Sequence, residues 1–253
     1  YTITDPCNNS TTKSATFTII DTTSPGISCQ PDDKTFECDG LTANEADATA
    51  WNTANIAKLE ACATDLCTDP IDVIVTSDYD FANLSDECAY TGTMLVTYTV
   101  TDPCGNDTTI TANFTIIDTT DPVISCQPDD RTFECNGLTN NLADADAWNA
   151  ANITKLEACA TDVCAPDAAV IVTSDYDFAN LSDLCGFTGA LTVTYTITDA
   201  CDNFITTTAT YTIEDTTDPT VTCDPQNAIH ECSGLDGNRG AAELWNAANI
   251  TAL

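Results

Sequence analysis

The chain has 253 residues, with 40 Asp and Glu against 6 Lys and Arg, which gives a formal net charge of −34 at pH 7. A charge of this sign excludes nucleic acid and anionic membrane surfaces as natural partners, and it favours cations. Hydrophobic residues still make up 43% of the chain, enough to build a folded core beneath an acidic surface. The sequence has no apolar run long enough to span a bilayer, so we expect no direct membrane insertion of this segment.

One sequence pattern returns at a fixed interval along the chain. The stretches TIIDTTSPGISC, TIIDTTDPVISC and TIEDTTDPTVTC begin at Thr18, Thr115 and Thr212, so the interval is 97 residues. The motif VIVTSDYDFANLSD, at Val73 and again at Val170, has the same interval. Such periodicity predicts tandem domains cut from a longer array. The expected divisions are the end of a preceding repeat (1–20), repeat A (21–117), repeat B (118–214) and the start of a following repeat (215–253).

Within each repeat, short strands come before a long period-two alternation. In repeat A, short strands are predicted around 26–29, 34–37 and 72–76, each bounded by Pro, Asp or Gly. Segment 43–61 is rich in Ala and lacks Gly and Pro, which predicts a helix inserted between strands and anchored by a buried Trp51. Two Thr-rich runs flank the turn TDPCGND and predict a long β-hairpin. The whole pattern predicts a mainly β chain of tandem β-sandwiches.

Cysteine usage indicates the compartment. Fifteen cysteines accompany a single His, which predicts disulfides in an oxidising, extracellular setting rather than zinc sites. Each complete repeat carries six cysteines, so we expect about three disulfides per repeat. The cysteines concerned are Cys29, Cys38, Cys62, Cys67, Cys88, Cys104, Cys126, Cys135, Cys159, Cys164, Cys185 and Cys201.

One pairing within each repeat is expected from the position of the hairpin turn. Cys88 precedes the hairpin and Cys104 lies in its turn, so we expect these two to pair. The same reasoning pairs Cys185 with Cys201. Closing a loop of that size would stabilise the fold by about 3 kcal/mol in the chain-entropy model.

Two schemes stay open for the other four cysteines of repeat A. Local pairing would join Cys29 to Cys38, and Cys62 to Cys67. Nested pairing would join Cys29 to Cys62, and Cys38 to Cys67, and would clamp both ends of the helix. We slightly favour the nested scheme because it ties the helix to the strands.

The order of these motifs resembles that of a known family. DTTDP linkers, a Glu-Cys pair before an acidic Trp-bearing segment, SDYDFANLSD followed by Cys, and VTYTITDAC are similar to the hyalin-repeat-like, immunoglobulin-like modules of giant surface proteins in gliding Gram-negative bacteria. The resemblance implies immunoglobulin-like β-sandwiches in a long adhesin or filament, gliding-motility adhesins included. It also implies secretion by the type IX route and a place on the bacterial cell surface. CATDVC adds a cysteine beside the one expected in such modules, so the family's pairing is not carried over.

The Asp-Thr-Thr motif resembles the O-glycosylation signal of the same bacteria. Plain turn residues are the alternative interpretation, and it is about equally favoured. The acceptors would be Thr22, Thr108, Thr119 and Thr216.

We also expect the DTTDP junction to hold calcium. Its proline stiffens the link, and Asp and Asn oxygens from the link and the hairpin turn are hard ligands of the kind calcium prefers. A divalent ion would offset repulsion in so acidic a chain. The alternative is that Asp and Thr are simply good linker residues. The candidate ligands are Asp102, Asn106, Asp107, Asp118, Asp121, Asp199, Asn203, Asp215 and Asp218.

No set of residues predicts catalysis. His230 stands where the other copies have Phe36 and Phe133, so we expect a packed strand position and no enzyme. The sequence favours a structural stalk or shaft whose partners are neighbouring repeats of the same long chain. Other parts of that chain would contact surface glycans or outer-membrane motility machinery. The alternatives are a self-assembling filament subunit and a glycan-binding surface module.

Overall fold

The computed structural model describes residues 1–85, 87–165, 169–182, 184 and 186–252. By its contacts the chain divides into two compact units. The larger contains Tyr1–Asp130, Asp146–Asp177 and Thr192–Thr210, and the smaller contains Arg131–Ala145, Phe178–Leu191 and Tyr211–Leu253. This division does not follow the 97-residue period, and the repeat boundaries given above stay predictions.

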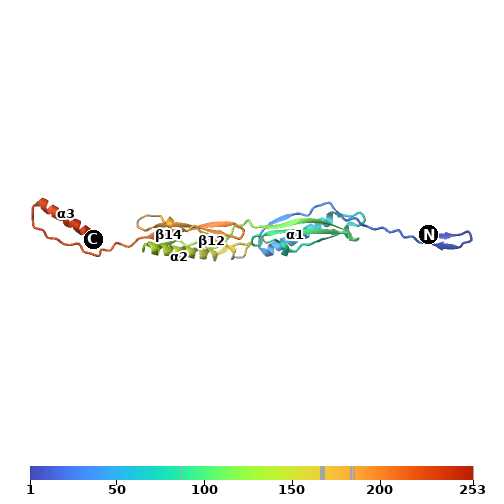
Figure 1. Ribbon diagram of the computed structural model, residues 1–253, viewed down its shortest axis with the longest axis horizontal. Helices are drawn as coiled ribbons and strands as arrows, with labels where there is room; N and C mark the ends of the chain where they lie inside the picture. Colours follow the sequence, from blue (N-terminus) through green and yellow to red (C-terminus); the bar gives the residue numbers. More distant parts are fainter. Residues whose placement is uncertain (86, 166–168, 183, 185, 253) are drawn as a thin grey trace. The chain divides into compact units, whose positions relative to one another are not determined.

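Repeat A contains a mixed four-stranded sheet, a two-stranded ribbon and one long helix (Figure 1). The large sheet has the strand order β4-β8-β7-β6, and β3 pairs with β5 in the ribbon. The predicted short strands are confirmed. The elements in chain order are β3 (Gly26–Ile27), β4 (Lys34–Glu37), α1 (Leu41–Cys62), β5 (Ala63–Thr64), a 3₁₀ helix (Pro70–Asp72), β6 (Ile74–Ser77), a second 3₁₀ helix (Phe81–Asn83), β7 (Gly92–Thr101) and β8 (Asp107–Ile117).

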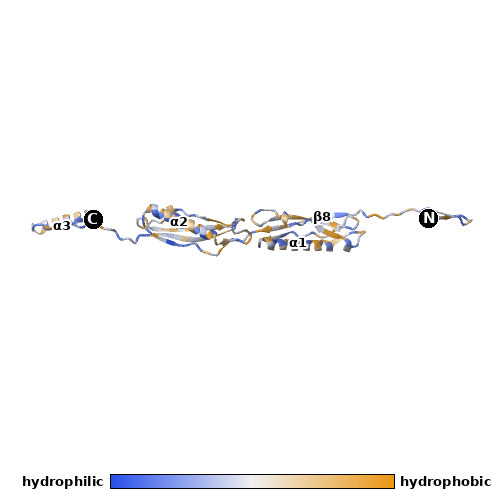
Figure 2. Cartoon of the chain, turned by 90° about the horizontal axis from the view of Figure 1, so that it is seen from below, coloured by the Kyte–Doolittle hydropathy of each residue, from blue (hydrophilic) through white to orange (hydrophobic). Residues whose placement is uncertain are grey.

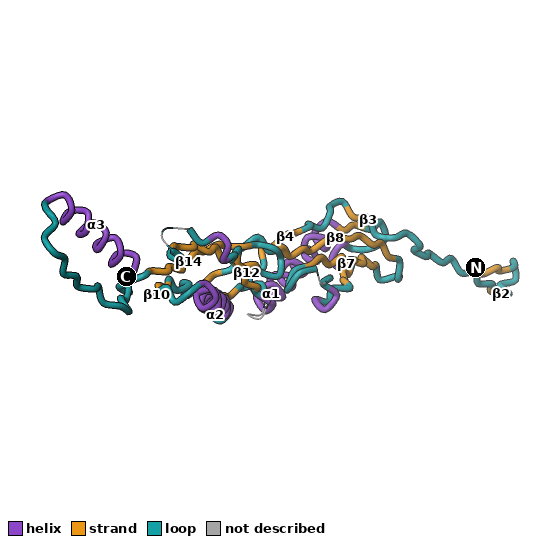
Figure 3. Tube along the Cα trace, turned by 60° about the vertical axis from the view of Figure 1, so that its left-hand side comes forward, coloured by secondary structure: helices purple, strands orange, loops and turns teal. Residues whose placement is uncertain are grey.

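The predicted long hairpin is confirmed as β7 and β8, which run antiparallel with β4 alongside β8 (Figure 3). Its register runs from Gly92 opposite Ile116 to Thr101 opposite Asp107. Successive side chains of a strand point to opposite faces, so the period-two pattern leaves the Thr-rich face outward. The apolar residues that β7 buries are Met94, Val96, Tyr98 and Val100.

The hairpin turn is built around the side chain of Asp102. Its Oδ1 accepts hydrogen bonds from the backbone N–H groups of Cys104, at 2.9 Å, and Asn106, at 2.8 Å. Gly105 has a φ of 87°, a conformation that glycine adopts without steric cost. Asp102 is only 5% exposed, so the turn places a buried carboxylate at this end of the sheet.

The helix α1 covers the buried face of this sheet (Figure 2). The Trp51 ring lies 5.3 Å from Phe114 and 6.3 Å from Tyr98, centroid to centroid, and its indole N–H donates to the Asp32 carbonyl at 2.6 Å. Asn55 donates from Nδ2 to the Tyr98 hydroxyl at 3.3 Å. Trp51 is 7% exposed, which confirms the predicted buried anchor.

The layer opposite the large sheet differs from that of the predicted sandwich. In the described part of repeat A, α1 and the short ribbon stand where a second large sheet was expected. Ala48, Trp51 and Leu59 are buried on one side of the helix, and Ile27 of the ribbon packs against the same core. The helix therefore covers the face of the large sheet that a second sheet would have covered.

Repeat B has the same order of elements. Its sheet has the order β10-β14-β13-β12, and β9 pairs with β11. The ring centroids of Trp148 and Tyr195 lie 6.5 Å apart, an arrangement equivalent to that of Trp51 and Tyr98. Its elements are β9 (Val123–Ile124), β10 (Arg131–Glu134), α2 (Leu138–Glu157), β11 (Ala160–Thr161), β12 (Ile171–Ser174), a 3₁₀ helix (Phe178–Asn180), β13 (Gly189–Thr198) and β14 (Phe204–Glu214). The flanking segments contain the hairpin β1 (Thr2–Thr4) with β2 (Ser10–Thr12), and the helix α3 (Leu235–Ala252).

Candidate functional site

Four disulfides join the described cysteines. Two of them close equivalent loops within a repeat, and two connect repeat A to repeat B. Their Cα–Cα distances, 5.3 to 6.0 Å, lie within the range of ordinary disulfides. The bonds within repeats are Cys29–Cys62 and Cys126–Cys159, and the bonds between repeats are Cys38–Cys164 and Cys88–Cys201.

For the four cysteines around the helix, the structure decides between the two pairing schemes. The nested bond between Cys29 and Cys62 is confirmed, and both local pairs are wrong. The second nested bond, from Cys38 to Cys67, is also wrong, because Cys38 pairs with Cys164. Cys164 is the equivalent of Cys67 one period later. Cys38 therefore bonds to the expected cysteine of the repeat pattern, but in repeat B and not in its own repeat.

The pairing expected for the hairpin cysteines is wrong in the same way. Cys88 pairs with Cys201, the equivalent of Cys104 in the next repeat, so neither Cys88–Cys104 nor Cys185–Cys201 forms. Cys185 itself lies outside the described residues. Three cysteines predicted to be bonded are free in the structure, and these are Cys67, Cys104 and Cys135.

Backbone geometry explains why Cys38 reaches the next repeat. It follows directly after β4, and its N–H donates to the carbonyl of Ile117, the last residue of β8, at 2.8 Å. The buried Asn44 side chain accepts from the N–H of Asp39 at 3.0 Å and donates to the Glu37 carbonyl at 2.9 Å. The chain is therefore fixed on both sides of Cys38, next to the point where repeat B begins.

Cys88 is held in a tight turn with Thr91. The Thr91 hydroxyl donates to the Cys88 carbonyl at 2.6 Å, and the Thr91 N–H donates to the same oxygen at 2.9 Å. The turn must pass close to the following strand, because a Cβ at Gly92 would lie 1.8 Å from the Ser85 carbonyl oxygen. A glycine at this position lets the two backbone segments approach.

Glu37 binds the linker that follows repeat A. Its carboxylate accepts from the N–H of Thr119 at 2.6 Å and from the hydroxyls of Thr119 at 3.1 Å and Thr120 at 3.0 Å. The bond from the Thr119 backbone is the main reason that the pKa of Glu37 lies below its ordinary value. Glu134 accepts the equivalent bonds from Thr216 and Thr217. The recurrent Asp-Thr-Thr motif thus supplies donors for the glutamate that ends β4 in repeat A and β10 in repeat B.

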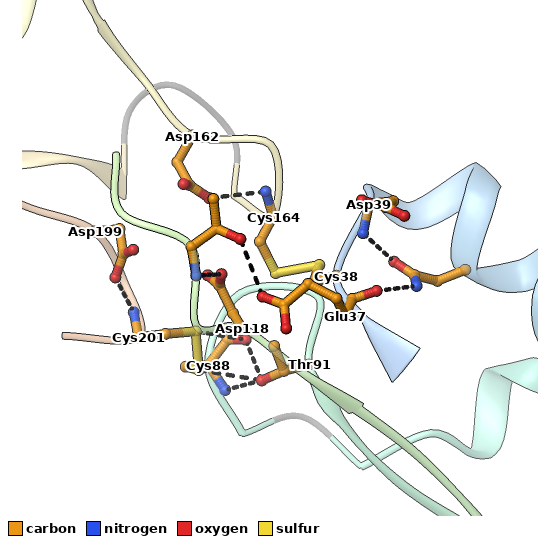
Figure 4. Close-up of a disulfide and its surroundings, with 12 residues drawn as sticks. Glu37, Cys38, Asp39, Cys88, Thr91, Asp118, Asp162, Cys164, Asp199 and Cys201 are labelled. Atoms are coloured by element: carbon orange, nitrogen blue, oxygen red, sulfur yellow. Dashed lines mark hydrogen bonds between the residues drawn. A yellow bond between two sulfur atoms is a disulfide. The ribbon is translucent and has the colours of Figure 1, made fainter. Parts of the chain in front are cut away.

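Three carboxylates gather beside the two bonds between repeats (Figure 4). Oxygens of Asp118, Asp162 and Asp199 all lie within 4.8 Å of one another. Asp162 Oδ1 accepts from the Cys164 N–H at 2.8 Å, and Asp199 Oδ1 accepts from the Cys201 N–H at 2.8 Å. Asp162 and Asp199 are 9% and 4% exposed and Asp118 is half-buried, so this concentration of negative charge is only partly open to water.

Asp118 is the least satisfied member of this cluster. Its Oδ2 atom is buried and has no hydrogen-bond partner, while Oδ1 accepts from the Thr120 N–H at 3.1 Å. Desolvation, with further contributions from Asp162, Asp199 and Glu37, raises the pKa of Asp118 above its ordinary value. A cation at this position would remove both the desolvation cost and the repulsion.

Residues predicted as calcium ligands divide into three groups. Asp118 and Asp199 lie together, and Asp102 lies in the equivalent cluster at the start of repeat A, with Asp21 and Asp65. Asn106 and Asn203 point their amide N–H groups at Asp102 and Asp199, so they orient carboxylates instead of offering oxygens. The remaining candidates are exposed and lie outside both clusters, and these are Asp107, Asp121, Asp215 and Asp218.

Sequence reasoning missed three carboxylates of these clusters. Asp65 and Asp162 stand in CATDLC and CATDVC, one period apart. This recurrence is the sequence feature that could have identified them as members of the clusters. Asp21 begins the first Asp-Thr-Thr motif and is the equivalent of Asp118. In the sequence these residues stand out only as parts of cysteine and turn motifs.

The candidate glycosylation sites are mostly engaged in hydrogen bonds. Thr108 Oγ1 donates to the Pro25 carbonyl at 2.7 Å, Thr119 Oγ1 binds Glu37, and Thr216 Oγ1 donates to Glu134 at 2.8 Å. Thr22 is exposed. Modification of these residues stays a prediction.

His230 does not occupy the packed strand position that the sequence predicts. It is exposed and lies outside any strand, so the Phe36 and Phe133 comparison was wrong on this point. Among the described residues, no helix combines the length and apolar character required to cross a membrane.

Comparison with known proteins gives no family assignment. No family model matches the chain, and no curated protein does. Among solved structures, the chain is similar to Drosophila N-cadherin EC1-4 (9% identity, 60% of this chain and 43% of that chain, TM-score 0.25) and to protocadherin gamma B7 domains 1-4 (12%, 57% and 39%, 0.24). A variant of titin domains I67–I69 is 6% identical, covers 75% of this chain and 65% of its own chain, and has a TM-score of 0.28. The neighbours are cadherin and immunoglobulin-like repeats, and this chain spans less than half of the two cadherins.

Substitution of Asp118 by Asn tests the electrostatics of the cluster. An Asp whose pKa is raised by folding stabilises the fold only below its unfolded pKa, and that contribution is lost as pH rises through the folded pKa. In chelator at pH 7, Asp118→Asn should therefore raise the melting temperature by about 2–4 °C. The gain should be smaller at pH 4, where increasing protonation of the wild-type carboxyl relieves the repulsion. Asp121→Asn, at an exposed carboxylate, is the matched control, and equal destabilisation of Asp118→Asn at both pH values would contradict the account.

Proposed function

We propose that this chain is a non-enzymatic segment of an extracellular shaft, built from tandem immunoglobulin-like modules that each carry a helix and are bonded covalently to the next module. The observation that carries the proposal is the pair of disulfides between repeats, Cys38–Cys164 and Cys88–Cys201. Disulfides of this kind persist only in oxidising surroundings, which supports an extracellular location.

The two bonds suit a part that transmits tension. They span 126 and 113 residues of sequence, and closing loops of this size stabilises the folded state by about 5 kcal/mol each in the chain-entropy model. Because both bonds leave repeat A and enter repeat B, a pull on the linker is shared by two covalent bonds. Glu37, which binds Thr119 and Thr120, adds a non-covalent hold on the linker itself.

The biological setting follows from the motif resemblance. We propose the stalk of a long adhesin or surface filament of a gliding bacterium, secreted by the type IX route and serving attachment or gliding motility. Its direct partners are neighbouring repeats, and contact with glycans or motility machinery belongs to other parts of the protein. Glycan stacking on Trp51 or Trp148 is disfavoured, because both are buried and both donate their indole N–H to backbone carbonyls.

Calcium is the cofactor we propose for the junction. Asp118 comes from the linker, Asp162 from the segment after α2, and Asp199 from the hairpin turn, so an ion held by all three would tie the linker to the body of repeat B. The buried, unpartnered Asp118 Oδ2 fits a hard cation, which prefers carboxylate oxygens. A hollow of about 330 Å³, lined in part by Thr120, Asp121 and Asp162, borders the cluster and offers a route for entry.

A calcium titration tests this site. Millimolar calcium should raise the melting temperature of the wild-type chain, because the ion binds the folded cluster and not the unfolded chain. Asp118→Asn should lose most of that increase, while Asp121→Asn should keep it. Equal responses of all three proteins would mean that calcium acts on the general negative charge and not at this cluster.

Single-molecule stretching tests the shaft function. In the oxidised chain the shortest covalent route uses Cys29–Cys62 and Cys88–Cys201, whose separations of 33 and 113 residues hide roughly 500 Å of extended chain. Reduction with dithiothreitol should therefore lengthen the fully stretched chain by about that amount.

The double variant Cys38→Ser, Cys88→Ser is the control for this measurement. It keeps only the two bonds within repeats, each with a separation of 33 residues, so reduction should add only roughly 220 Å. If the wild type gained no more than this variant, the bonds between repeats would carry no load, and the shaft proposal would fail.

A further inference from the structure

Repeat A begins with the same carboxylate cluster that repeat B uses at its junction. Asp21, Asp65 and Asp102 have oxygens within 4.8 Å of one another, as their equivalents in repeat B do. Asp21 Oδ2 and Asp65 Oδ2 are buried without a hydrogen-bond partner. The start of repeat A therefore has the chemistry of a junction whose other side comes from a different domain.

Two free cysteines stand at this cluster in the same local setting as their bonded equivalents. Cys67 N–H donates to Asp65 Oδ1 at 2.8 Å, as Cys164 N–H donates to Asp162 Oδ1 at 2.8 Å. The hairpin turn holds Cys104 in the same way, with its N–H 2.9 Å from Asp102 Oδ1. Both thiols are exposed and unpaired.

The complementary side of a junction recurs in repeat B, around Cys135. Cys135 N–H donates to the Glu214 carbonyl at 2.7 Å, as Cys38 N–H donates to Ile117. Asn141 accepts from the Asn136 N–H at 3.1 Å and donates to the Glu134 carbonyl at 3.0 Å, as Asn44 does around Cys38. Cys135 is free, so this repeat presents a thiol in the geometry that Cys38 uses for bonding.

We propose that Asp21, Asp65, Cys67, Asp102 and Cys104 form an acceptor face for a further copy of this repeat. The equivalents of Cys38 and Cys88 in that copy pair with Cys67 and Cys104, respectively. Each bond forms when two thiols lose two protons and two electrons to a disulfide oxidant such as oxidised glutathione, which leaves as two reduced molecules. The inference rests on the proposed function. It adds that the same two disulfides join each repeat to the next copy of the repeat.

A chain with one added repeat tests this face. A copy of residues 118–214 that carries Cys164→Ser and Cys201→Ser is inserted between Ile20 and Asp21, which keeps the period and places a complete repeat before repeat A. Cys135→Ser and Cys185→Ser in the original repeat B then make every mapped cysteine unique. After refolding with oxidised glutathione, peptide mapping should find Cys67 bonded to the inserted equivalent of Cys135, and Cys104 bonded to the inserted equivalent of Cys185. Alkylation of Cys67 and Cys104, complete in the parent chain, should fall to near zero.

The original junction serves as an internal control for folding. If Cys38–Cys164 and Cys88–Cys201 form in the extended chain while Cys67 and Cys104 stay alkylated or pair with each other, the acceptor face is wrong and the shaft proposal stands. If those two bonds are absent from the parent chain as well, both proposals fail together. Cys67→Ser with Cys104→Ser should remove the new cross-linked peptides and leave the original junction unchanged.

Discussion

Covalent bonds that cross from one repeat to the next are the constraint on which the rest of the structure depends. Cys38 and Cys88 leave different parts of repeat A and meet Cys164 and Cys201, which flank the carboxylate cluster of repeat B. Cys38 follows β4 and Cys164 follows α2, while Cys88 precedes β7 and Cys201 lies in the hairpin turn of repeat B. The Trp51 anchor and the Asn44 hydrogen bonds can therefore be understood as the means by which each repeat presents its cysteines.

The disulfides also explain how so much negative charge can collect at one place. Carboxylates held as close as Asp118, Asp162 and Asp199 repel one another, and burial strengthens the repulsion because water screens it less. Desolvation and this repulsion together raise the pKa of Asp118 above its ordinary value. Bonds on either side keep the cluster assembled, and a bound cation would turn the same carboxylates from a source of strain into an additional link.

Sequence reasoning gave the local structure correctly where a single repeat determines it. The alternation in 94–100 and 110–116 defined the hairpin, and Trp51 was correctly placed in the core. Pairing of Cys38 and Cys88 could not be obtained in this way, because a strict period gives every cysteine an equivalent partner one repeat away. The choice between a partner in the same repeat and its equivalent in the next repeat depends on where the end of β4 and the Cys88 turn lie in space. The layer opposite the large sheet could not be obtained from the sequence either, since strand patterns do not show which face the helix will cover.

The most direct test of this account is peptide mapping of the oxidised chain after its free thiols are blocked. Residues around equivalent cysteines differ between the repeats, as in SDECAY against SDLCGF, so every cross-linked peptide has a distinct mass. The account predicts peptides that join Cys38 to Cys164 and Cys88 to Cys201, with Cys67 and Cys104 blocked. Peptides that join Cys38 to Cys67 and Cys88 to Cys104 would contradict it, because each repeat would then be closed on itself.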